Sequence, residues 1–335
     1  MLIYFAKRFA WLVFIVFCAI TVTFVLSRII PACPASLAAG LDAGPEAVAR
    51  LREQMGLDLP LHVQYIHYIR DVITLDFGFA LQTRRPVIMD IGRNFAATLE
   101  LVLLSFSIYV FVGILLGVIW AARPRGFLSR FLSTITSAGV ATPLFWSGLL
   151  LQMVFAGQLR WLPTAGRLPQ GVAPPSSVTG LYTVDSLLAG DFALFLTALT
   201  YLILPVTALV FNKMAIASRL TYSTVTTELE MDYVRTARAK GVGENAILIR
   251  HVLKNALNPV VSMLGLQFGW LIAGTILVEV VFSFPGLGLY LFNAFRTFDY
   301  NPIMAVTIIV TIVFVVVNTI VDLIYPILDP RVGVK

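Results

Sequence analysis

Long runs of apolar residues recur along the whole chain. A helix needs about 20 consecutive apolar residues to cross the hydrocarbon core of a bilayer, and six runs reach that length: 9–30, 98–121, 131–155, 192–211, 259–282 and 303–325. No alternation of apolar and polar residues persists long enough to indicate a lipid-facing β-barrel. The pattern therefore predicts an all-α polytopic membrane protein with six transmembrane helices.

Composition agrees with this class and excludes others. Of the 335 residues, 59% are hydrophobic and only 13% are charged, against about 25% charged residues in an ordinary soluble domain. So few charges could not keep that much apolar surface in water. The balance excludes a soluble enzyme, a disordered chain and a nucleic-acid-binding protein, in spite of the formal net charge of +6.

The positions of Lys and Arg predict the orientation. With the N-terminus inside, the inside segments hold 14 of the 24 Lys and Arg residues, whereas the two shorter outside loops hold only Arg160, Arg167 and Arg296. Because short cytoplasmic loops carry the excess of basic residues, we expect both termini and the 213–258 loop to be cytoplasmic. A lipoprotein-like cleavage before Cys33 is the alternative for the first run, but Pro31 and the length of the run favour an uncleaved helix.

The spans divide the chain into four parts. Residues 1–30 form an N-terminal transmembrane helix, 31–97 an extracytoplasmic helical insertion, 98–325 a transmembrane domain, and 326–335 a cytoplasmic tail. Within the insertion we expect one helix over 45–55 and a second beginning at Pro60. Segment 157–191 is rich in Pro, Gly and Ser and predicts an irregular outside loop.

The 213–258 loop predicts a helical hairpin. Thr227 and Glu230 are spaced as a capping box for a first helix, which Lys240-Gly241 would end. A second helix is expected over 244–257, stopping at Asn258-Pro259. Leu229, Tyr233 and Ala237 would form one apolar stripe on the first helix. Acids and bases alternate along it, which suits a protein partner better than anchoring to lipid.

Known catalytic signatures are missing from the sequence. There is no G-x-x-x-x-G-K-[ST], no H-E-x-x-H and no G-x-S-x-G, and His62 and His67 have the wrong spacing for a helical metal pair, so no metal site is expected. Ionisable residues within spans are functional candidates by default. Glu279 and Asp322 are the candidates for the pathway or gate. Glu100 and Lys213 have simpler explanations, solvation near one membrane face and snorkelling towards the other.

Several motifs resemble those of bacterial ABC importer permeases of the dipeptide/oligopeptide/nickel group. The resemblance rests on three segments: Asp232-Tyr233-Val234-Arg235-Thr236-Ala237-Arg238-Ala239-Lys240-Gly241, His251-Val252-Leu253-Lys254-Asn255-Ala256-Leu257, and Val281-Phe282-Ser283-Phe284-Pro285-Gly286-Leu287-Gly288. Outside these, Met55-Gly56-Leu57-Asp58 and Thr98-Leu99-Glu100-Leu101 look similar to the same group. The chain is most similar to the first permease of a dipeptide permease pair.

Three departures qualify the resemblance. Arg235-Thr236-Ala237 stands where the general importer motif has Glu-Ala-Ala, as is usual in the peptide subgroup. Lys254 lies near a position where other importers carry Pro, and Cys33-Pro34 replaces a frequent Asp-Pro. The first two departures argue against the interpretation as a sugar, phosphate or amino-acid importer.

The resemblance implies a type I ABC importer permease fold in the bacterial cytoplasmic (inner) membrane. It implies a second homologous permease, two ABC ATPase subunits that bind ATP and Mg, an extracytoplasmic substrate-binding protein and a peptide substrate. This chain would hold no cofactor and catalyse no reaction. It would move the substrate across the membrane by alternating access. The residues implied in coupling to the ATPases are Asp232, Tyr233, Arg235, Thr236, Ala237, Arg238 and Gly241.

Other functions stay open at this point. Within the class, the substrate could be nickel, a nickel chelate or another peptide-like solute. A self-contained channel or secondary transporter is expected to show internal repeats and interrupted helices, and no clear repeat is visible. An intramembrane hydrolase would need a nucleophile and a base that the spans do not offer together.

Overall fold

The computed structural model describes residues 2–29, 44–54 and 56–328, and the described part is helical apart from turns, irregular loops and an isolated β-bridge between Phe79 and Pro86. Cys33, and with it the question of cleavage, lies outside the described residues. Among these, five helices are long and apolar enough to cross a membrane, and a bent pair adds a sixth if it counts as one span. The chain divides into two compact units, 1–98 with 285–316, and 99–284 with 317–335.

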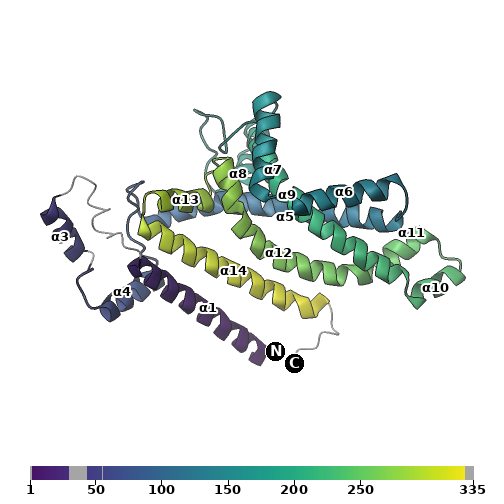
Figure 1. Ribbon diagram of the computed structural model, residues 1–335, viewed down its shortest axis with the longest axis horizontal. Helices are drawn as coiled ribbons and strands as arrows, with labels where there is room; N and C mark the ends of the chain where they lie inside the picture. Colours follow the sequence, from purple (N-terminus) through teal and green to yellow (C-terminus); the bar gives the residue numbers. More distant parts are fainter. Residues whose placement is uncertain (1, 30–43, 55, 329–335) are drawn as a thin grey trace. The chain divides into compact units, whose positions relative to one another are not determined.

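The first unit combines the N-terminal part of the chain with residues 285–316 (Figure 1). Its helices are α1 (Leu2–Ile29), α3 (Pro45–Gln54), α4 (Leu61–Ile73), the start of α5 (Val87–Ala122), α13 (Leu287–Arg296) and most of α14 (Tyr300–Leu328). Ile20 of α1 and Ile308 of α14 meet in its apolar core, together with Val87. The hydroxyl groups of Thr23 and Tyr68 lie 3.0 Å apart and join α1 to α4.

Helices α3 and α4 lie where the sequence predicts them, the second beginning directly after Pro60. Their location outside the membrane stays a prediction.

Helix α9 (Phe192–Leu229) is the centre of the second unit. Around it pack α6 (Phe127–Ala141), α7 (Leu144–Leu151), α8 (Tyr182–Leu188) and α12 (Leu253–Val281). Polar side chains reinforce two of these contacts: the Asn212 amide donates to the Gly139 carbonyl of α6 at 2.9 Å, and Lys213 Nζ donates to Gln267 Oε1 of α12 at 3.1 Å. Lys213 is therefore held by a neighbouring helix rather than only snorkelling to the membrane surface.

The helix expected over 131–155 is broken. Helix α6 ends at Ala141, and α7 with the π-helix η1 (Gln152–Gln158) leaves at 108° to it. Pro143 explains the break, because a proline disfavours the helical conformation in the residue before it. Accordingly, Thr142 is extended, with ψ of 124°.

The close approach of α5 and α9 depends on two glycines one turn apart. A Cβ atom at Gly113 would lie 2.6 Å from Ala217 Cβ, and one at Gly117 would lie 2.7 Å from the carbonyl oxygen of Ser218. Real Cβ atoms do not approach other atoms so closely, so only glycine lets the backbones come this near. Small residues serve this purpose in membranes, where apolar lipid removes the hydrophobic drive for helices to associate.

Three local predictions were wrong. Thr227 does not cap a helix, because α9 runs on to Leu229 and the Thr227 hydroxyl donates to the Ser223 carbonyl at 3.0 Å. The second hairpin helix does not stop at Pro259, which lies inside α12. Proteins in bilayers tolerate a proline inside a helix, because neighbouring groups can satisfy the backbone carbonyl that loses its N–H donor. The 157–191 segment, expected to be irregular, contains a helix, α8.

The glycine contacts predict a difference between two substitutions in the same helix. Gly117→Ala should destabilise the chain because the new Cβ meets α9, lowering the melting temperature in detergent by several degrees. Gly92→Ala, also in α5, meets nothing within 4 Å and should be neutral or stabilising by up to about 1 kcal/mol. Equal melting temperatures for the two variants would contradict the close-packing explanation.

Candidate coupling hairpin and pathway residues

The α10 hairpin, residues 230–252, follows directly from α9. Helix α10 (Asp232–Ala239) leads through Gly241 to α11 (Glu244–Ala246) and the π-helix η2 (Ile247–Val252), which continues into α12. Gly241 has φ of +76°, and a Cβ there would meet nothing within 4 Å. Glycine is therefore required by the left-handed backbone rather than by space, as the sequence indicated.

One side of α10 is anchored in its own protein. Val234 is fully buried and packs with Val225, Ile247 and Val252. Ala237 is partly buried against the same cluster. Tyr233, expected on the same apolar stripe, is 36% exposed and is not part of this cluster. The apolar side of α10 is therefore centred on Val234 instead of Tyr233.

Tyr233 is tied to the end of α9. Its hydroxyl donates to Glu228 Oε2 at 2.6 Å. Partial burial, with the nearby Glu228 carboxylate, raises the pKa of Tyr233 above its ordinary value. The side chain is therefore a neutral hydrogen-bond donor at physiological pH.

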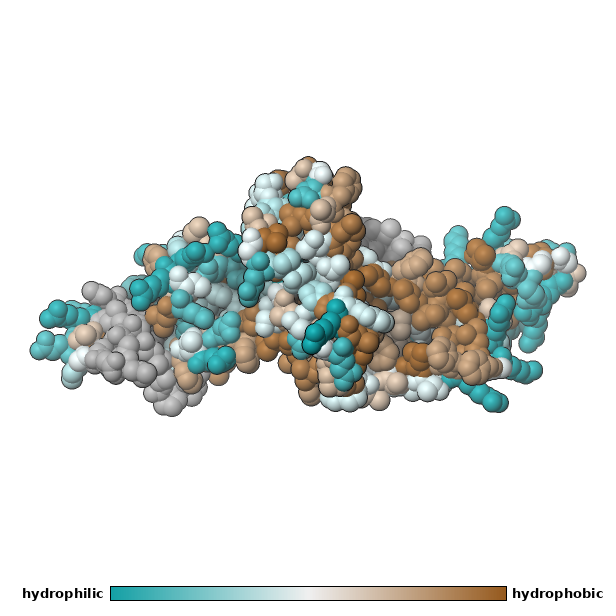
Figure 2. Space-filling view, turned by 90° about the horizontal axis from the view of Figure 1, so that it is seen from above, coloured by the Kyte–Doolittle hydropathy of each residue, from teal (hydrophilic) through white to brown (hydrophobic). Residues whose placement is uncertain are grey.

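The other side of α10 is charged and open. The side chains of Asp232 and Arg235 are 92% and 73% exposed and form an i, i+3 ion pair at 3.3 Å. Figure 2 shows hydrophilic side chains gathered at the end of the second unit that carries α10 and α11, beside an apolar surface. An exposed pair of this kind contributes little to stability, so Asp232 and Arg235 are available to another molecule.

Arg238 has a different role from its neighbours. Its Nε and Nη2 donate to the two carboxylate oxygens of Glu244, at 2.7 and 3.1 Å. This fork-shaped pair spans the Gly241 turn and joins α10 to α11. A paired geometry of this kind gives orientation as well as attraction, so Arg238 shapes the hairpin.

Glu279 lies in the last turn of α12 and is fully buried. The helix exit beside it is attached to the loop that follows η1. The Gly166 N–H donates to the Phe282 carbonyl at 3.0 Å, and the Phe284 N–H donates to the Glu279 carbonyl at 2.8 Å. The carboxyl group is thus enclosed by its own chain. Asp322 lies in α14, but its side chain is outside the described part of the chain.

The structure brings together residues that the sequence did not connect. Glu100, expected to be solvated, is buried and paired with Arg167, counted only as an outside charge, and with Thr183. The sequence contained one signal of this contact. Glu100 is an acidic residue at the predicted outer end of a span, and such a residue needs a partner if it is buried. Among the described residues, no three His, Cys, Asp or Glu side chains are grouped to hold a metal ion.

The described helices have the architecture of a multi-pass membrane protein, and the comparisons with known proteins give its class. The family described as "Binding-protein-dependent transport system inner membrane component" matches residues 113–334, and the corresponding N-terminal family matches residues 1–102. The chain belongs to this family. It is a permease subunit of an ABC importer and a multi-pass inner-membrane protein.

Curated relatives cover nearly the whole chain. The dipeptide transport system permease protein DppB of Alkalihalophilus pseudofirmus is 38% identical over 332 residues, 99% of each chain. The probable D,D-dipeptide transport system permease protein DdpB of Escherichia coli is 38% identical, covering 96% of this chain and 95% of its own. The glutathione transport system permease protein GsiC of Salmonella typhimurium is 35% identical over the full length of both.

The packing of α10 predicts how the hairpin is held. Val234→Ala should cost about 2 kcal/mol, because it removes buried methyl groups and leaves a cavity. Amide hydrogen exchange over 232–240 should accelerate accordingly. Arg235→Ala, on the exposed side, should leave exchange nearly unchanged, and equal acceleration by both substitutions would show that α10 is not anchored through Val234.

Proposed function

We propose that the chain is one of two permeases that import dipeptides or short oligopeptides by alternating access. A second homologous permease would complete the pathway, two ABC ATPase subunits would bind ATP and Mg, and an extracytoplasmic binding protein would deliver the peptide. The names of the relatives support the substrate class, since several are dipeptide permeases. Glutathione is itself a tripeptide, so the Salmonella relative supports another peptide-like solute as the second candidate.

The α10 hairpin carries this proposal. We place it, with both termini, in the cytoplasm on the Lys and Arg distribution. There it would insert into a groove on an ATPase subunit. Val234 and Ala237 fix it to the permease, while Asp232, Arg235 and Thr236 are exposed and able to contact the partner. Charges presented in this way set the register of an interface.

The general test is to purify the chain with its second permease, ATPases and binding protein and to measure ATP hydrolysis with candidate ligands. A dipeptide or short oligopeptide should stimulate hydrolysis, and the chain alone should hydrolyse no ATP. Stimulation by nickel or a nickel chelate, with none by peptides, would contradict the peptide assignment.

Arg235→Glu tests docking without disturbing the fold, because the side chain is exposed and its one ion pair is weak. We expect ligand-stimulated ATPase and uptake to fall at least about tenfold, a loss of roughly 1.4 kcal/mol or more at the interface. Gly241→Asp should have the same effect by straining the left-handed turn. Arg125→Glu, on an exposed turn elsewhere on the proposed cytoplasmic side, is the control. Normal uptake with Arg235→Glu and Gly241→Asp together would remove the hairpin from the mechanism.

We also propose that Glu279 and Asp322 contribute to the pathway or gate. Glu279 would act from its buried position, through the attachment of the α12 exit to the 157–191 loop. Glu279→Gln should change the rate of peptide uptake several-fold, because a carboxylate in low dielectric interacts strongly with its surroundings. The amount of assembled complex, measured by size-exclusion chromatography, should not change. Unchanged uptake of every transported peptide would leave Glu279 with a structural role only.

A further inference from the structure

A buried ion pair at the outer end of the second unit has no part in the function proposed so far. Arg167 Nη2 lies 2.5 Å from Glu100 Oε2, and the two side chains are only 7% and 4% exposed. Nη2 also donates to the Gly180 carbonyl at 3.0 Å, and the guanidinium carbon lies 3.5 Å from the centre of the Tyr182 ring. Arg167 therefore contacts α5, the 178–181 turn and the beginning of α8.

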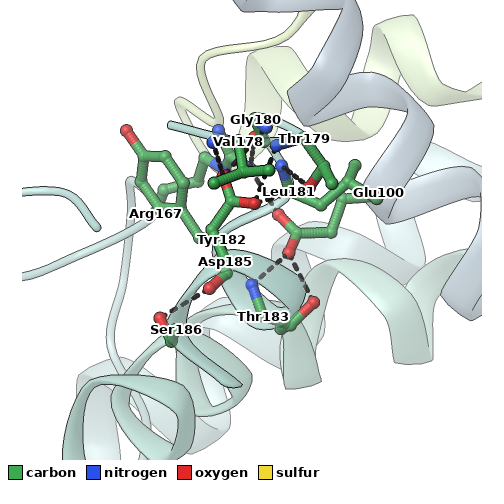
Figure 3. A network of polar contacts seen from close by, with 10 residues as sticks. All are labelled: Glu100, Arg167, Val178, Thr179, Gly180, Leu181, Tyr182, Thr183, Asp185 and Ser186. Atoms are coloured by element: carbon green, nitrogen blue, oxygen red, sulfur yellow. Dashed lines mark hydrogen bonds and ion pairs between the residues drawn. The ribbon is translucent and has the colours of Figure 1, made fainter. Parts of the chain in front are cut away.

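Glu100 makes the second half of the junction (Figure 3). Its Oε1 accepts hydrogen bonds from the N–H and the hydroxyl of Thr183, both at 2.7 Å. A single carboxylate of α5 thus holds the first turn of α8 with one oxygen and Arg167 with the other. Together these contacts fasten the 157–191 loop to a transmembrane helix.

The loop itself is braced around Asp185. This side chain is 1% exposed and accepts from the N–H groups of Val178, Thr179 and Gly180 and from the Thr179 hydroxyl. Burial opposes its ionisation, but these hydrogen bonds outweigh burial and lower the pKa of the Asp185 carboxyl. Residues 178–186 are therefore a rigid piece that can move as one.

The junction reaches the exit of α12. Gly166, the neighbour of Arg167, donates to the Phe282 carbonyl at 3.0 Å, and the Phe284 ring centre lies 5.8 Å from the Arg167 guanidinium. Separating Arg167 from Glu100 would thus loosen the loop and the end of α12 together. The segment that would move includes Glu279 at that end.

The energetics favour a junction that can open. Taking two charges out of water costs nearly as much as their attraction returns. Here the compensation is incomplete, because Arg167 Nε is buried without a hydrogen-bond partner among the described residues. Water entering between the charges would hydrate both, which would return part of the free energy lost when the pair separates. Two apolar side chains could fill the same space, but water would not stabilise them when they separate.

We infer that Arg167 and Glu100 are positioning residues that form an outer latch, closed at rest and separated when the pathway opens to the outside. The inference rests on the proposed transport function. The competing explanation is a static brace that only stabilises the loop. The two differ in what an uncharged replacement should do.

The test uses the complete transporter in proteoliposomes with Glu100→Gln alone and with Glu100→Gln combined with Arg167→Met. Gln keeps an acceptor for Thr183, and Met fills the space of the arginine stem. The single variant leaves Arg167 buried without its counter-ion, so we expect ATP hydrolysis without peptide to rise several-fold. The double variant should keep the melting temperature yet lose most peptide-stimulated hydrolysis and uptake, because its junction has no charges to hydrate. If the pair is only a static brace, the double variant should show peptide-stimulated hydrolysis and uptake like those of the wild type.

Hydrogen exchange over 178–186 gives a readout that needs no peptide. In the native complex these amides should exchange faster with a non-hydrolysable ATP analogue than without nucleotide, and in the double variant they should not. Unchanged exchange in the native complex, or wild-type uptake in the double variant, overturns the latch. Absence of peptide stimulation in the native complex would instead contradict the peptide transport function itself.

Discussion

The close contact between α5 and α9 is the constraint on which the second unit depends. Lipid offers no hydrophobic drive for helices to associate, so contact requires backbones that approach closely. Gly113 and Gly117 provide this against Ala217 and Ser218. With α9 fixed in this way, α6, α7, α8 and α12 pack around it, and a helix of 38 residues, about 57 Å long, stays in one piece.

The segments at the two ends of α9 place their charges in different surroundings. At its start, the loop containing α8 is held by an ion pair removed from water, between Arg167 and Glu100. At its end, α10 is anchored through the apolar Val234 and leaves Asp232 and Arg235 in water. Charges in water can meet a soluble partner at low desolvation cost, and charges out of water respond strongly to hydration. We propose that α9 carries motion between these ends.

Much of this could be predicted from the sequence, where the signal is local. Apolar runs placed the spans, Pro60 placed α4, and Gly241 placed the hairpin turn, because each depends on a property of neighbouring residues. Pro143 indicated the bend in the sequence, but the long apolar run around it led to the prediction of one continuous span. The burial of Glu100 could not be predicted, since its partner Arg167 is 67 residues away and no spacing rule connects them. The central place of Val234 could not be predicted either, because its partners, such as Ile247, come from the returning helix.

The most direct test of the account is the number of peptides imported per ATP hydrolysed, measured in proteoliposomes with two glycines inserted between Glu230 and Met231. This insertion makes the junction of α9 and α10 flexible while leaving Val234 and Arg235 in place. We expect hydrolysis to continue and import per ATP to collapse, whereas the same insertion between Pro124 and Arg125, in an exposed turn, should leave the ratio unchanged. An unaltered ratio after insertion at Glu230 would contradict a mechanical connection through α9.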